Sequence, residues 1–122
     1  MRSETMTAIL SVQTSDNPER QYSPLVLSQT AKMTDIDAKV YFPGQALRVL
    51  DERRFQSIGL GAFPSVYEII KKCVDMGIEM FVCEASMQMR ESEDVRLING
   101  LRVVGAATLN DLVLEADATM RF

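Results

Sequence analysis

Residues 79–86 read Glu79-Met80-Phe81-Val82-Cys83-Glu84-Ala85-Ser86, a short apolar run that ends in a cysteine and passes into polar residues. A run of this length and composition is typical of a buried strand. The residues after Cys83 favour a helical turn. The sequence therefore places Cys83 where a strand ends and a helix begins.

Segments of similar character recur on both sides of this stretch. We expect strands at Thr7–Gln13, Asp37–Phe42, Glu79–Cys83, Leu101–Val104 and Ala118–Phe122. We expect helices at about Glu19–Met33, from the capping box at Ser65 to Met76, and at Gly105–Asp117, with short helical pieces at Gln45–Leu50 and after Glu84. Asp51–Phe63, with its charged run and two glycines, is typical of a surface loop.

Strands that alternate with helices favour a parallel sheet covered on both faces. The sequence therefore predicts an α/β fold, a three-layer sandwich with a five-stranded, mainly parallel sheet whose strand order stays open. Apolar spacing predicts which helix residues are buried. These residues are Tyr22, Leu25, Val26, Gln29 and Met33 in the first long helix, and Leu109, Leu112 and Val113 in the last.

Composition narrows the function. A chain of 122 residues suits one domain, residues 1–122. A net charge of −4 is unfavourable for binding a phosphate backbone, and no apolar run is long enough to span a bilayer. No secretory signal is recognisable at the start of the sequence, so we expect a cytoplasmic protein that binds neither nucleic acid nor membrane.

The chain contains no histidine and two cysteines. This excludes serine–histidine and cysteine–histidine catalysis and the usual zinc and iron ligand sets, so we expect no metal. Gly59-x-Gly61 lacks the third glycine of a dinucleotide fingerprint, and we expect no cofactor. A phosphoacceptor receiver is also excluded, because the third strand ends in Cys83 where an aspartate is needed.

Cys83 is the strong nucleophile at the carboxyl edge of the predicted sheet, where ligands collect in such folds. Amide groups at the start of the next helix stabilise a thiolate, which is the reactive form of cysteine. Ser86 is a further candidate donor. Glu84 opposes a very low pKa. The alternative is that Cys83 is a small buried hydrophobe.

Gly105 and Ala106 precede the last helix, and their small side chains allow a close approach of backbone amides to an anion beside Cys83. Tight packing of a strand against a helix is the alternative for this segment. Cys73 lies on an apolar helix face and is expected to be a core thiol without a role in chemistry. A disulfide between the two cysteines is not expected in a reducing cytoplasm.

Several segments together resemble the DsrE/DsrF-like family of small sulfur-relay proteins, over nearly the whole chain. They are Pro18-Glu19-Arg20, Ser23-Pro24-Leu25, Ala38–Phe42, Phe81–Met87, Val104–Leu112 and Glu115-Ala116-Asp117. The most specific parts are the Cys-x-x-Ser-Met segment at Cys83 and the Gly-Ala-Ala-Thr segment at Gly105.

This resemblance implies a protein that carries sulfane sulfur as a persulfide on Cys83, a sulfurtransferase-type activity supported by Ser86, Gly105 and Ala106. It also implies a trimeric or hexameric homo-oligomer and a TusA-type sulfur carrier, or a related thiol, as the acceptor in sulfur oxidation or tRNA thiolation. Many members lack the cysteine, so a non-catalytic assembly module is the first alternative. A small-ligand-binding α/β domain is the second.

Overall fold

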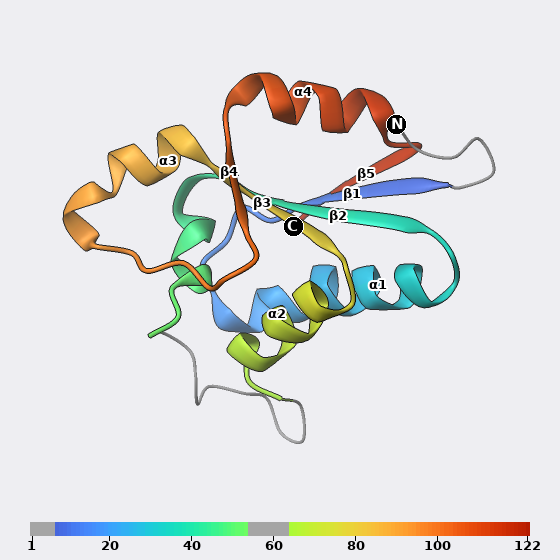
Figure 1. Ribbon diagram of the computed structural model, residues 1–122, viewed down its shortest axis with the longest axis horizontal. Helices are drawn as coiled ribbons and strands as arrows, with labels where there is room; N and C mark the ends of the chain where they lie inside the picture. Colours follow the sequence, from blue (N-terminus) through green and yellow to red (C-terminus); the bar gives the residue numbers. More distant parts are fainter. Residues whose placement is uncertain (1–6, 54–63) are drawn as a thin grey trace.

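The structure is a computed structural model that describes residues 7–53 and 64–122 (Figure 1). The loop expected at Asp51–Phe63 lies outside the described residues from residue 54 onward. At its start, the structure differs from the expectation of a solvated surface. Asp51 is buried, because Arg53 pairs with its carboxylate at 3.1 Å and its backbone forms a bridge with Leu97.

The five strands form one parallel sheet in the order β4-β3-β2-β1-β5. Their bounds are β1 Ala8–Val12, β2 Asp37–Phe42, β3 Glu79–Cys83, β4 Arg102–Val104 and β5 Ala118–Arg121. All five lie within the predicted segments. The expected α/β fold with a five-stranded sheet is confirmed, and the structure adds the strand order.

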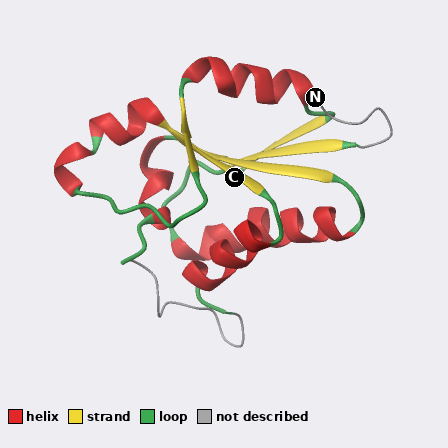
Figure 2. Ribbon diagram, viewed as in Figure 1, coloured by secondary structure: helices red, strands yellow, loops and turns green. Residues whose placement is uncertain are grey.

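Helices cover both faces of the sheet (Figure 2). The α-helices are α1 Tyr22–Met33, α2 Val66–Asp75, α3 Glu84–Met89 and α4 Ala106–Glu115, and the 3-10 helices are η1 Pro18–Gln21, η2 Gly44–Leu50 and η3 Glu91–Glu93. Figure 1 shows α4 on one face and α1 and α2 on the other. The predicted three layers are therefore present.

Local sequence explains where α2 begins and ends. The Ser65 hydroxyl accepts a hydrogen bond from the Glu68 amide, which is the cap that the sequence predicts. Gly77 follows the helix with a φ of +83°, a left-handed conformation that glycine adopts without strain. The chain can therefore turn at Gly77 and enter β3.

The two faces of the sheet bury cores of different size. The larger core lies under α1, α2 and η2 and contains Val40, Phe42, Met80 and Val82 from the strands. The smaller core lies under α4 and is built from Leu10, Tyr41, Phe81 and Leu112, with Cys83 packed at its border. Side chains that alternate along each strand divide the residues between the two cores.

The predicted buried stripe of α1 is wrong in part. Val26 and Met33 are 37% and 74% exposed, whereas Leu25, Ser28 and Ala31 are buried. The small side chains on the Ser28–Ala31 side let the helix lie close to the sheet, and the hydrophobic spacing does not reveal this. The predicted buried face of α4 is also wrong in part, because Leu112 is buried but Val113 is 42% exposed.

Truncation in the larger core should be costly. Phe42→Ala removes a fully buried ring and should lower the free energy of unfolding by about 3–5 kcal/mol, as measured by urea denaturation. Met33→Ala, at an exposed position, should change it by less than about 0.5 kcal/mol. Equal effects of the two substitutions would contradict this description of the core.

Candidate functional site

Cys83 is the last residue of β3 and the N-cap residue of α3. It pairs in register with Val104 on β4, and its side chain points to the face of the sheet that α4 covers. The thiol is free and only partly buried. The sequence-based placement of Cys83, where the strand ends and the helix begins, is therefore confirmed.

Four groups near Cys83 lower the pKa of its thiol by hydrogen bonding. They are the hydroxyls of Ser86 and Tyr41 and the backbone amides of Ala85 and Ser86. Burial on its own would raise the pKa of the thiol, but these donors favour the thiolate and outweigh burial. The pKa of Cys83 therefore lies below the ordinary value for cysteine, and the thiolate is available at lower pH than usual.

The Ser86 hydroxyl is held in place from its other side. Ser86 is 6% exposed, and its Oγ accepts a hydrogen bond from the Gly44 amide at 2.7 Å. Gly44 turns the chain after β2 with a φ of +62°, a conformation that suits glycine. Because the amide occupies an acceptor position of the oxygen, the hydroxyl proton is left to donate to Cys83.

Tyr41 comes from β2, the strand beside β3. It pairs in register with Phe81, so it shares a face with Phe81 and with Cys83 two residues further along. The ring is 1% exposed. Burial, and next the hydrogen bond to Cys83, raise the pKa of the Tyr41 hydroxyl above its ordinary value, so the phenol keeps its proton and donates it in this hydrogen bond.

Tyr41 is not among the site residues that the sequence predicts. The available signal was its place one residue before the end of a strand that is rich in apolar residues. Its use required knowing that β2 and β3 are neighbours, and the sequence leaves the strand order open.

The structure places the other predicted site residues differently. Gly105 and Ala106 follow β4 at the same edge of the sheet, and both are exposed. The amides that hydrogen-bond to the sulfur come from α3. Of the three predicted supporting residues, the structure thus brings Ser86 into contact with Cys83 and shows no such contact for Gly105 or Ala106 within the described part of the chain.

Cys73 is fully buried in the larger core, on the opposite face of the sheet from Cys83. Burial raises the pKa of its thiol to about 11, although the Gln29 side-chain amide donates to the sulfur at 3.5 Å. Both cysteines are free. The expectation of a core thiol at Cys73 is confirmed.

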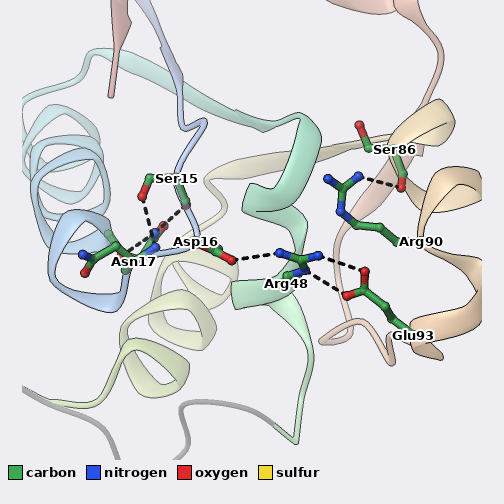
Figure 3. Close-up of polar contacts among 8 residues, drawn as sticks. Ser15, Asp16, Asn17, Arg48, Ser86, Arg90 and Glu93 are labelled. Atoms are coloured by element: carbon green, nitrogen blue, oxygen red, sulfur yellow. Dashed lines mark hydrogen bonds and ion pairs between the residues drawn. The ribbon is translucent and has the colours of Figure 1, made fainter.

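An ion-pair network holds together the loops beside the site (Figure 3). Arg48 on η2 contacts Asp16 at 3.2 Å and Glu93 on η3 at 2.8 Å. Arg90 donates to the carbonyl oxygen of Ser86 at 3.4 Å. Glu93 thus links η3 to η2, and the separate Arg90 hydrogen bond lies within the last turn of α3.

Of the two methionines that follow the site, Met87 packs against the larger core and Met89 is 77% exposed. No cluster of three or more cysteine and acidic side chains placed to hold a metal ion occurs among residues 7–53 and 64–122. Over the same ranges, no helix has the length and apolar character needed to cross a membrane.

The protein thus has a parallel α/β fold, and a cysteine of lowered pKa lies at the carboxyl end of β3. The model of the DsrE/DsrF-like family matches residues 7–122. The chain therefore belongs to the DsrE/DsrF-like family, as the sequence resemblance indicates.

Two solved structures show the same fold. The ychN protein from E. coli has a TM-score of 0.73 and 15% sequence identity, and the match covers 96% of this chain and 100% of that one. A protein of unknown function, MTH1491 from Methanobacterium thermoautotrophicum, has a TM-score of 0.72 and 16% identity, and the match covers 95% of this chain and 99% of that one. The search of curated proteins gave no match.

The donors around Cys83 predict a shifted pH profile. Alkylation of Cys83 by iodoacetamide should persist to lower pH than for an ordinary cysteine, because the pKa is lowered and the thiolate survives as pH falls. Ser86→Ala should move the profile to higher pH and slow alkylation several-fold near neutral pH. Peptide mass spectrometry measures both, and Cys73 should stay unmodified until the protein unfolds.

The matched control is Ser92→Ala, which removes an exposed hydroxyl on η3. Its profile should equal that of the unmodified sequence. If Ser86→Ala and Ser92→Ala gave the same profile, the Ser86 hydroxyl would have no part in stabilising the thiolate.

Proposed function

We propose that the protein is a sulfur relay that carries sulfane sulfur as a persulfide on Cys83 and passes it to a thiol of a partner. The observation that supports this proposal most is the position of a free, partly exposed thiol at the end of β3 and the start of α3, where neighbouring hydroxyls and amides lower its pKa. A stabilised thiolate with access to solvent is the form of cysteine that attacks sulfur. Membership of the DsrE/DsrF-like family supports it independently.

Loading begins when the Cys83 thiolate attacks the outer sulfur of a donor persulfide. A bond forms between Cys83 Sγ and that sulfur, the sulfur–sulfur bond of the donor breaks, and its electron pair leaves on the donor thiolate. Delivery repeats the step in reverse, with an acceptor thiolate attacking the outer sulfur. The transferred atom keeps its oxidation level, so neither step requires an oxidant or a reductant.

The acceptor in this proposal is a TusA-type carrier or a related thiol, met in the cytoplasm. We propose a homo-oligomer, trimeric or hexameric, as its assembled form. Exposed apolar side chains on β4 and α4 support a surface between copies, since Val103, Val113 and Leu114 are 45%, 42% and 83% exposed.

These apolar side chains also favour the second candidate function, a non-catalytic assembly module that uses the fold to bind other subunits. The two functions differ in what they require of Cys83. A relay needs a thiol that reacts in the folded protein, whereas an assembly module does not.

A sulfur-loading experiment distinguishes the sulfur relay from the assembly module. Protein treated with polysulfide should gain the mass of sulfur, and Cys83→Ser should abolish the gain while Cys73→Ser preserves it, as read from intact mass. Loaded protein mixed with a small thiol should lose that mass again. If Cys83→Ser still loaded, or if Cys73→Ser abolished loading, the relay proposal would be wrong.

A further inference from the structure

A groove of about 350 Å³ lies on the same face of the sheet as Cys83, between α4 and the starts of β2, β3 and β4 (Figure 1). Glu79 and Phe81 line it from β3. Because side chains alternate along a strand, both share a face with Cys83, which packs at the border of the core that contains Phe81. The groove therefore leads from the start of β3 toward Cys83.

The groove has an excess of negative charge. Its lining contains four carboxylates and two cations, which are Asp37, Glu79, Asp111, Glu115, Lys39 and Arg102. Lys39 pairs with Asp37 at 2.7 Å, and Arg102 pairs with Glu79 at 2.9 Å. Both basic side chains are thus neutralised by carboxylates of the groove itself. The two remaining carboxylates, Asp111 and Glu115, lie on the α4 wall and are exposed.

Arg102 shows how a cation fits this groove. Its guanidinium lies 5.4 Å from the centre of the Phe81 ring, and its Nη1 reaches the Glu79 carboxylate. Phe81 and Leu112 give the groove a buried apolar lining. Apolar surface beside a carboxylate suits lysine and arginine, which bury their methylene groups and keep the charged end in water. A second basic side chain is accommodated by the same chemistry, with Asp111 as its carboxylate.

We propose that this groove docks a basic, extended segment of the protein that exchanges sulfur with Cys83. The inference rests on the proposed relay function and specifies the chemistry of the partner. Charge complementarity selects this occupant. A second copy of this chain, with its net charge of −4, is a less favourable occupant of an acidic groove.

The length of β3 sets the spacing that the partner requires. From Glu79 to Cys83 the strand rises about 13 Å, at about 3.3 Å per residue. An extended partner segment spans this length with about four residues. The partner should therefore carry a lysine or arginine about four residues from its reactive thiol.

Sulfur release to short peptides tests the docking site. Protein loaded with polysulfide is mixed with end-blocked peptides that have cysteine at one end, three glycines, and lysine or glutamate at the other, in both orientations. Release is read from intact mass, and the rate of each peptide with glutathione persulfide corrects for the reactivity of its thiol. In at least one orientation, lysine should accelerate release about fivefold over glutamate at low salt. The ratio should fall toward one in about 0.5 M sodium chloride.

Two matched double variants assign the preference to the groove. Asp111→Asn with Glu115→Gln removes two exposed carboxylates from the α4 wall, and the lysine-to-glutamate ratio should fall below about twofold. Glu68→Gln with Asp75→Asn makes the same change of charge at exposed positions on α2, on the opposite face of the sheet, and should keep the full ratio. An equal fall in both would reflect net charge alone and would overturn the docking site.

NMR of ¹⁵N-labelled, unloaded protein locates the peptide without any sulfur chemistry. A lysine peptide with serine in place of cysteine should shift the backbone amides of Phe81, Arg102 and Asp111 more than those of α2. Absence of shifts in the groove would overturn the proposal. A change of oligomeric mass in the α4 variant would then identify a second copy as the occupant.

The docking site and the relay fail in different ways. If Cys83 loads but the preference for lysine is absent, or survives removal of the two α4 carboxylates, the docking site is overturned and the relay stands. If Cys83 does not load, the relay is wrong, and the amide shifts alone decide whether the groove binds a basic segment.

Discussion

The hydrogen bonds that Cys83 accepts from Ser86 and Tyr41 are the interactions on which the rest of the site depends. They come from two separate parts of the chain, since α3 supplies Ser86 and β2 supplies Tyr41. Each donor is fixed by a contact of its own, Ser86 by the Gly44 amide and Tyr41 by its burial. The pKa of Cys83 therefore depends on the pairing of β2 with β3, which places Tyr41, and on the turn after β2, which places Ser86.

The parallel sheet makes this arrangement available. Side chains alternate between its faces, so Cys83 lies on the side of the smaller core while Cys73 on α2 is sealed in the larger one. The two thiols therefore lie on opposite faces of one sheet, and their pKa values shift in opposite directions. The pKa of one is raised by burial to about 11, and that of the other is lowered by hydrogen bonds.

Much of this could be predicted from the sequence. The apolar run ending at Cys83, the cap at Ser65 and the alternation of elements predicted the α/β fold and the place of the thiol, because these signals are local. The contact with Tyr41 could not be predicted, since it depends on which strands are neighbours. Met33 and Val26 were wrongly predicted to be buried. The spacing of apolar residues identifies an apolar stripe on the helix, but it does not show which side of the helix packs against the sheet.

Selective ¹³C labelling of cysteine followed by NMR titration tests the central claim most directly, because the Cβ shift reports ionisation of each thiol in the folded protein. We expect Cys83 to titrate at a lower pH than an ordinary free cysteine measured under the same conditions, and Tyr41→Phe to raise its pKa. A Cys83 that titrates at or above the pH of the free cysteine, unmoved by loss of the Tyr41 hydroxyl, would contradict this account.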